Sequence, residues 1–167
     1  MIVKTSFSTG HVQSSLNYIG RNGALEKGKP AIFDREGNML SREDLLPIRQ
    51  EIDGYDMNRR YIFSPADAEY TKEEISIAVR DSLEQYQVQT ERNFDYVFAI
   101  HDHNGRTHAH VIAYGDTESL HMDKYDLGLL RETALELEME NTKSIKVGYE
   151  NEKDIFIESE KEYSIGD

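Results

Sequence analysis

The stretch from Phe94 to Gly115, FDYVFAIHDHNGRTHAHVIAYG, constrains this chain more than any other part of its sequence. Two apolar runs, Tyr96–Ile100 and Val111–Tyr114, flank the dipeptide Asn104-Gly105. An Asn-Gly pair between strand-like runs is a strong β-hairpin signal, because both residues tolerate a positive φ. The sequence therefore predicts two adjacent antiparallel strands joined by a tight turn.

Histidines gather where these two strands approach the turn. Five of the six histidines in the chain fall between residues 101 and 121, at His101, His103, His108, His110 and His121. Residues two apart in a strand share a face, so His108 and His110 should project together, and His101 should reach them across the ladder. Three imidazoles on one face can hold a divalent metal ion that stays open to water or phosphate oxygen. The alternative is that they are ordinary polar strand residues, but their clustering favours a metal site.

The chain has no cysteine, so disulfides, thiolate ligands and thiol catalysis are excluded. Any metal must be held by histidine or carboxylate. Asp102 has two interpretations: a carboxylate that orients one of the imidazoles, or a solvated side chain. We expect His103 to be an exposed turn residue and not a ligand.

Composition indicates one domain of ordinary size, since 167 residues with 38% apolar content can bury a core. No apolar run is long enough to span a membrane, and the N-terminus lacks a signal-peptide pattern. We therefore expect a soluble, cytoplasmic protein with no membrane segment.

The net charge of −13 is unusual for a protein that binds nucleic acid. The acidity is uneven, however. Residues 1–115 hold 13 basic and 17 acidic side chains, whereas residues 116–167 hold 6 and 15. Most of the excess negative charge therefore follows the histidine cluster, and the first sixty residues are close to neutral.

Periodicity and capping residues predict the remaining elements. Strands are expected at residues 1–8 and 60–64, helices at 11–20, 72–88 and from Asp123 onward, and a short strand at 118–123. Capping boxes at Ser41–Asp44 and Thr71–Glu74 should open two helices. Residues 24–59 are interpreted either as a flap over a site or as a plain surface connection. The glutamates at 132, 136, 138 and 140 should form a solvated face, and residues 144–148 and 154–157 a late hairpin.

This order of elements indicates an α+β fold: an antiparallel central sheet with helices packed on one face. The other face would carry the histidines and remain open to a ligand. A nucleophile for such a site is harder to identify. Tyr18 lies in the short helix after the first strand, three residues before Arg21, and could be either a nucleophile or an ordinary aromatic residue.

His101, followed by His108-Ala109-His110 and the apolar Val111-Ile112-Ala113, resembles the motif of HUH endonucleases, in which two histidines flank a hydrophobic residue. More narrowly, it resembles relaxases, which nick DNA in plasmid mobilisation. The segment around Tyr18, SLNYIGRNG, is similar to the tyrosine motif of that family, and Arg60–Ser64 resembles the strand before its middle helix. The likeness covers roughly residues 1–140.

The resemblance implies a nuclease domain at residues 1–142 with an acidic extension at 143–167. It implies that His101, His108 and His110 hold Mn or Mg, with Zn, Ni or Co as alternatives, and that Asp102 supports the ligands. Tyr18 would attack single-stranded DNA at an origin, giving a 5′-phosphotyrosine and a free 3′-OH. Substrate phosphates would be bound by Arg21, Arg60 and Arg106, and accessory mobilisation proteins would be partners.

Three other functions remain open. The chain could be a replication initiator or a transposase of the HUH class, which would share the metal, the tyrosine and the chemistry. It could be a non-catalytic DNA-binding protein of the same fold. It could also be a metal hydrolase that uses activated water and has no need of Tyr18.

Overall fold

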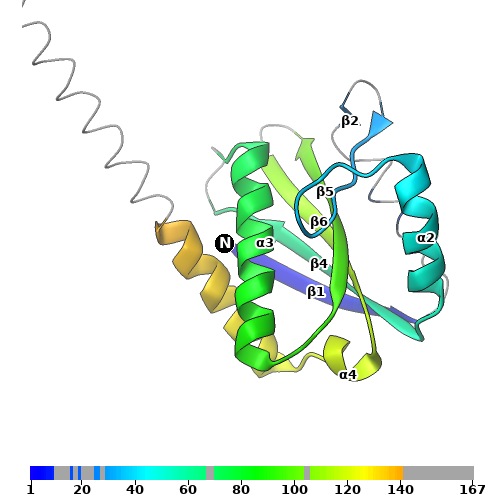
Figure 1. The fold of residues 1–167 in the computed structure, drawn as a ribbon. Helices are drawn as coiled ribbons and strands as arrows, with labels where there is room; N and C mark the ends of the chain where they lie inside the picture. Colours follow the sequence, from blue (N-terminus) through cyan, green and yellow to red (C-terminus); the bar gives the residue numbers. More distant parts are fainter. Residues whose placement is uncertain are drawn as a thin grey trace, which may run out of the picture.

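The computed structural model describes residues 1–9, 16, 19, 25–26, 29–66, 70–103 and 106–140. Its centre is a four-stranded antiparallel sheet with the strand order β1-β4-β6-β5 (Figure 1). These strands are β1 (Ile2–Thr9), β4 (Met57–Ser64), β5 (Asp95–His103) and β6 (Arg106–Tyr114). The two-residue strands β2 (Leu25–Glu26) and β3 (Lys29–Pro30) pair separately. The expected α+β fold with an antiparallel sheet is confirmed.

Helices start where the sequence places capping residues. Helix α2 (Arg42–Asp53) begins after Ser41 and α3 (Lys72–Thr90) after Thr71, each with a complete capping box. A further helix occupies residues 124–140, and Asp123 accepts hydrogen bonds from the backbone nitrogens of Tyr125 and Asp126 at its start. Such contacts satisfy backbone N–H groups that have no partner within the helix. The predicted starts of these three helices are therefore confirmed.

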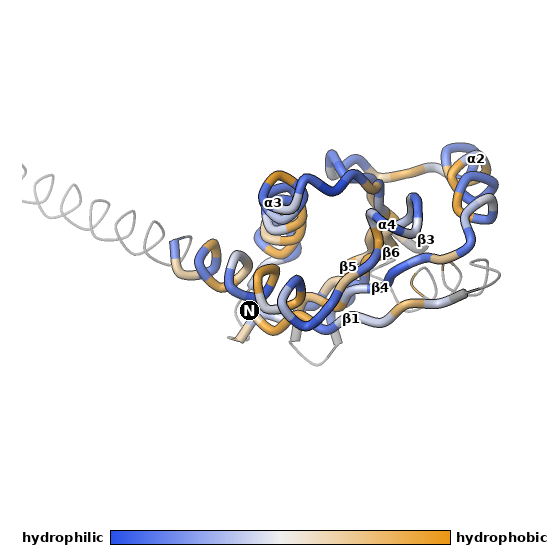
Figure 2. The backbone as a smooth tube through the Cα atoms, turned by 90° about the horizontal axis from the view of Figure 1, so that it is seen from below, coloured by the Kyte–Doolittle hydropathy of each residue, from blue (hydrophilic) through white to orange (hydrophobic). Residues whose placement is uncertain are grey.

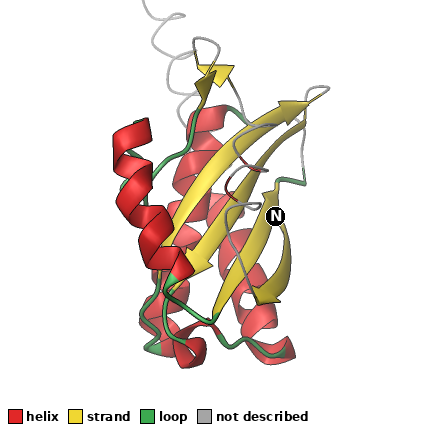
Figure 3. Ribbon diagram, turned by 90° about the vertical axis from the view of Figure 1, so that its right-hand side faces the viewer, coloured by secondary structure: helices red, strands yellow, loops and turns green. Residues whose placement is uncertain are grey.

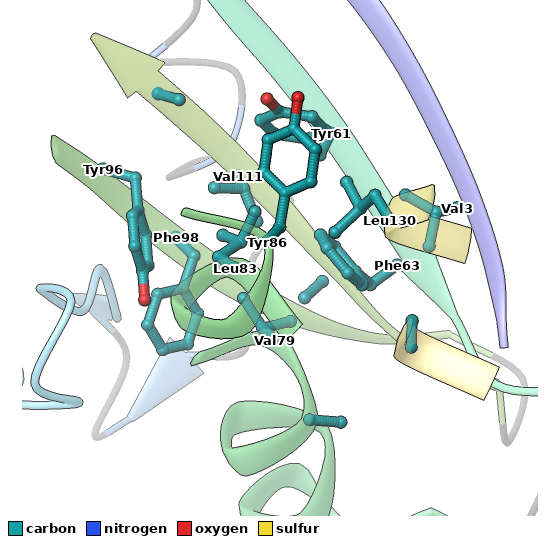
Figure 4. Close-up of a cluster of buried hydrophobic side chains, with 14 of the residues drawn as sticks. Val3, Tyr61, Phe63, Val79, Leu83, Tyr86, Tyr96, Phe98, Val111 and Leu130 are labelled. Carbon is teal, nitrogen blue, oxygen red and sulfur yellow. The ribbon is translucent and has the colours of Figure 1, made fainter. Parts of the chain in front are cut away.

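One face of the sheet packs against α3 and helix 124–140, and Figure 4 shows the side chains of this first core. Strand residues on this face alternate with those on the other, as the pleat requires. The first core includes Val3, Tyr61, Phe63, Phe98 and Val111 from the strands, Val79, Leu83 and Tyr86 from α3, and Leu130 from helix 124–140.

The opposite face is also covered in part, by α2, so the expectation of helices on one face only needs correction. Figures 2 and 3 show α2 and α3 on opposite sides of the sheet. A second core joins α2 to strands β5 and β6 and contains Leu16, Ile19, Ile32, Ile52, Val97, Ala99, Ile112 and Tyr114. The reason is visible in the strand at residues 96–100, because a continuous apolar run must be buried on both faces.

The structure also clarifies the segment at residues 24–59, for which a flap and a surface connection were both open. Leu40, Leu45 and Ile48 pack against the second core, and Ile52 is fully buried in it. Phe33 forms two backbone hydrogen bonds with Phe98 on the outer edge of β5, at 2.8 and 2.9 Å. The described part of this segment is thus a packed layer of the fold.

The predicted strand at residues 118–123 is wrong. Thr117–Leu120 forms the short helix α4 instead. Asp116 caps it by accepting a hydrogen bond from the backbone nitrogen of Ser119 at 2.8 Å. An acceptor at this position favours a helical turn over an extended chain, because it satisfies an exposed N–H group of the first turn.

Glu138, which the sequence predicts on a solvated face, is instead buried, with 7% of its surface exposed. It pairs with the amino group of Met1 and accepts a hydrogen bond from the backbone nitrogen of Ala66 at 3.1 Å. Its position follows from helical spacing, because Leu130, Ala134 and Glu138 are four residues apart and share one face. The predicted hairpin at residues 144–157 and the helix at 11–20 lie outside the described residues, apart from Leu16 and Ile19.

The two-sided packing of the sheet can be tested on α2 alone. Replacing the buried Ile52 by Ala should lower the free energy of unfolding by about 2 to 5 kcal/mol, because it leaves a cavity against β5 and β6. Leu46 of the same helix is 53% exposed, so Leu46→Ala should change the free energy of unfolding by less than about 0.5 kcal/mol. Urea unfolding at equilibrium measures both. Equal effects of the two substitutions would contradict the placement of α2.

Candidate metal centre

The register of β5 and β6 brings three histidines together on one face of the sheet. His101 lies directly opposite His108, and His110 lies opposite Ala99 in β5 and Ile62 in β4. The intervening residues Thr107, Ala109 and Val111 are buried, and Ala109 and Val111 belong to the first core. The predicted pairing of the two histidine strands is therefore confirmed, whereas the turn at Asn104-Gly105 lies outside the described residues.

The three imidazoles are close enough to share one ion. Their ring centroids are separated by 5.3 Å (His101–His108), 4.5 Å (His101–His110) and 5.1 Å (His108–His110). Each ring offers one nitrogen such that all three nitrogens lie within 4.8 Å of one another. Nitrogens bound to a common ion at about 2.1 Å lie about 3.0 to 3.4 Å apart, so small ring rotations suffice to close the site.

The protonation of His110 suits a ligand. Burial, followed by the charges of His101 and His108, lowers the pKa of His110 to about 4. At neutral pH this imidazole is therefore uncharged and presents a lone pair. Neutral imidazoles are the form that divalent metals bind, so the residues of this cluster fit a divalent ion with three nitrogen ligands and further positions for oxygen.

His101 is the most buried of the three, at 2% exposure, and has a backbone partner. Its Nε2 lies 3.0 Å from the carbonyl oxygen of Ile19. A carbonyl only accepts, so in the neutral ring this contact assigns the hydrogen to Nε2 and leaves the lone pair on Nδ1. Backbone carbonyls commonly fix the orientation of ligating histidines in this way.

A pocket of about 390 Å³ adjoins His110 on the same face of the sheet. It lies over β1, β4 and β6, and its lining includes Lys4, Ser6, Ile19, Arg60, Ile62, His110 and Ile112. The strand register explains the arrangement, because Lys4 pairs with Ile62 and Ile62 pairs with His110 in one row across three strands. With strands about 4.8 Å apart, the backbone of Lys4 is about 10 Å from that of His110.

The described lining of the pocket is cationic, although the chain as a whole is acidic. Among the described residues, the lining contains Lys4 and Arg60 and no aspartate or glutamate. The pocket therefore joins three features on one surface: cationic side chains, aliphatic side chains and an imidazole of the candidate metal centre. This combination suits a ligand that carries phosphate.

The structure brings some of the predicted site residues to the site and not others. Arg60 lines the pocket, as a substrate-binding residue should. Asp102 is exposed and alternates with His101 along β5, so its side chain leaves the opposite face of the sheet, and the geometry gives its expected supporting role no support. The backbone of Arg106 pairs with that of His103 at the turn end of the hairpin. Tyr18 and Arg21 lie outside the described residues.

Comparison with known proteins adds no assignment. No protein-family model matches this chain, and no curated protein aligns with it. The resemblance to HUH endonucleases thus depends on the motif residues themselves. In the described part of the chain, no helix is both long enough and apolar enough to cross a membrane.

Lys4 also lines the pocket, and the sequence did not predict its place there. The alternation of side chains along the first strand does indicate which face Lys4 occupies. Val3 is fully buried in the first core, so its neighbours Ile2 and Lys4 must point to the other face. What the sequence lacked was the pairing that sets Lys4 in the same row as His110.

If the three histidines hold the metal, removing one of them should weaken metal binding, whereas removing a histidine outside the cluster should not. His108→Ala should weaken Zn²⁺ binding by roughly 100-fold or more, since even outer-shell changes at metal sites cost 10- to 100-fold. His121→Ala is the matched control, because His121 is exposed at the end of α4 and outside the cluster. Isothermal titration calorimetry measures both. Similar affinities for the two variants would contradict the site.

The lowered pKa of His110 predicts a pH dependence of stability. Its folded value of about 4 lies below the usual value of 6.5, so between these pH values the unfolded chain binds more protons. Stability should therefore fall as pH drops from about 6.5 to 4. In His110→Gln this contribution is absent and the fall should be smaller.

Urea unfolding from pH 7.5 to 4.5, with a chelator present, measures this difference. Parallel stability profiles for the wild-type protein and His110→Gln would show that His110 is not held in its neutral form by its surroundings.

Proposed function

We propose that this protein is a metal-dependent endonuclease of the HUH class that nicks single-stranded DNA through Tyr18. The observation that carries the proposal is the convergence of His101, His108 and His110 across β5 and β6. The spacing of these residues resembles the relaxase motif. A role at an origin of plasmid mobilisation, in the cytoplasm and with accessory mobilisation proteins, follows from that resemblance.

The charge and shape beside the histidines support phosphate as the ligand. A divalent ion, when bound, supplies a Lewis acid that polarises a phosphoryl oxygen. Mn or Mg is the expected ion, with Zn, Ni or Co as alternatives. Lys4 and Arg60 would neutralise neighbouring phosphates of the strand from the pocket next to His110. The histidines would hold the ion without adding charge to the site.

The neighbour of Tyr18 in the chain supports its role. The carbonyl of Ile19 lies 3.0 Å from His101, and Ile19 also lines the pocket with His110. Ile19, which follows Tyr18 directly in the sequence, thus contacts the most buried histidine of the cluster and also lines the pocket.

The proposed step is a transesterification. The phenolic oxygen of Tyr18 forms a bond to the phosphorus, and the bond from phosphorus to the 3′ oxygen of the preceding nucleotide breaks. The leaving 3′ oxygen takes a proton, and the phenolic proton passes to solvent. The 5′-phosphotyrosine keeps one phosphodiester bond, so the reverse attack by the 3′-OH can rejoin the strand without a nucleotide cofactor.

A labelled-strand experiment tests this step. The protein is incubated with Mn²⁺ and a tiled set of single-stranded oligonucleotides that covers the DNA around its gene. Strands labelled at the 3′ end should give a labelled protein band in a denaturing gel, whereas strands labelled at the 5′ end should give only a shortened product. Tyr18→Phe and His108→Ala should abolish the band.

Tyr125→Phe is the matched control and should behave as the wild-type protein does. Tyr125 is 74% exposed on helix 124–140, and this helix packs against the first core, on the face of the sheet opposite the histidines. A covalent band that survives Tyr18→Phe would refute the assignment of the nucleophile. Cleavage without a protein-linked product would favour a hydrolase that uses water, and binding without cleavage would favour a non-catalytic protein of this fold.

A further inference from the structure

We propose that the pocket beside His110 holds one unpaired nucleotide of a single-stranded nucleic acid, with Lys4 as the phosphate-binding residue and Ile62 as part of the nucleoside wall. The inference rests on the proposed function for its class of ligand. It goes further by assigning a subsite and two residues with separate roles, and by giving the single-strand preference of the proposed function a physical cause.

The position of the pocket fits a nucleotide next to the reacting phosphate. Lys4, Ile62 and His110 form one row across β1, β4 and β6. Arg60 and Ile112 pair in the adjoining row and also line the pocket. A strand that passes over His110 would therefore place its next nucleotide over these rows, between His110 and Lys4, whose backbones lie about two strand spacings apart.

The distribution of charge favours a phosphate in this pocket. The chain has 32 acidic and 19 basic residues, yet the pocket lining, as far as the structure describes it, includes two cations and no carboxylate. The acidic side chains of α3 and helix 124–140 accompany the first core, on the opposite face of the sheet. These two helices together hold nine acidic and four basic residues. Helix α2, on the histidine face, also holds four acidic and two basic residues, so the cationic character belongs to the described lining of the pocket and not to the whole face.

The aliphatic wall accounts for the rest of the ligand. Ile19, Ile62 and Ile112 line the pocket, and none of its lining residues in the described part of the chain is a tyrosine or phenylalanine. Its volume of about 390 Å³ is near the lower end of the range of about 300 to 1,000 Å³ for small-molecule sites. A single sugar and base fit this description better than a stacked run of bases, which uses aromatic platforms.

The concave shape of the pocket should favour unpaired strands over duplex. A duplex presents its bases inside a stack, and a nucleotide must leave the stack before it enters a pocket. That transition costs a few kcal/mol in a duplex and much less in a single strand. The pocket should therefore favour single-stranded DNA even where the phosphate contacts are the same.

Fluorescence anisotropy with a labelled single-stranded DNA of about 16 nucleotides, an upper site size for compact single-strand binding domains, tests the two roles separately. Lys4→Ala should weaken binding about fivefold at low salt and reduce the slope of log affinity against log salt by about 0.7, the value for one lost phosphate contact. Lys4→Arg should restore most of both. Ile62→Ala should weaken binding while leaving the salt slope unchanged.

Lys72→Ala is the matched control, because Lys72 is an exposed lysine at the start of α3 on the opposite face of the sheet. It should leave affinity and salt slope as in the wild-type protein. Zn²⁺ titration and thermal unfolding of each variant confirm that the metal centre and fold are intact. Equal behaviour of Lys4→Ala and Lys72→Ala overturns the subsite, as does binding of duplex DNA as tight as that of single-stranded DNA.

This test and the labelled-strand experiment can refute the subsite and the nicking reaction separately. A binding defect in Lys4→Ala without any protein-linked DNA in the wild-type protein would refute nicking and support the subsite. A covalent band with unchanged binding in Lys4→Ala would support nicking and refute the subsite. Wild-type protein that binds no single-stranded DNA would refute the subsite.

Discussion

The pairing of β5 with β6 is the interaction on which the rest of the structure depends. Alternation along β6 sends Ala109 and Val111 into the first core and His108 and His110 to the other face. A slip of one residue would exchange these sets, burying imidazoles against α3 and exposing the apolar residues. The free energy that fixes the histidine cluster is therefore the burial of aliphatic side chains that take no part in metal binding. Because β6 lies between β4 and β5, hydrogen bonds on both edges also fix its backbone.

The histidine face of the sheet is covered only in part, and this partial cover explains both the lowered pKa of His110 and the pocket beside it. Helix α2 and the residues Leu16 and Ile19 bury one portion of this face around Val97, Ala99 and Ile112. Desolvation at the edge of this cover lowers the pKa of His110, so an imidazole rather than an imidazolium faces its two neighbours. The portion over β1, β4 and β6 remains hollow and forms the pocket. The same sheet face thus holds the histidine cluster and, beside it, the cationic side chains that line the pocket.

Local signals in the sequence predicted the hairpin, the capping boxes at Ser41 and Thr71, and the convergence of the three histidines. Each of these depends on residues that are close in the chain or related by strand periodicity. Contacts between distant segments were not predictable in this way. The face that α2 covers, the burial of Glu138 against Met1, and the presence of Lys4 in the row of His110 all depend on which elements meet. Asp102 shows the reverse case, because its nearness to His101 in the chain suggested a contact that strand alternation directs to the opposite face.

The negative charge of the chain does not by itself argue against a phosphate ligand. Interactions between exposed charges are screened over about 8 Å at physiological ionic strength, which is less than the thickness of a sheet with helices packed on it. A phosphate beside His110 would therefore respond more strongly to Lys4, Arg60 and any bound ion than to the glutamates of helix 124–140. Net charge acts instead at long range, where it slows the approach of a polyanion. The acidic composition should thus slow the encounter with a polyanion more than it weakens the contacts made in the pocket. Those contacts depend on the strand register described above.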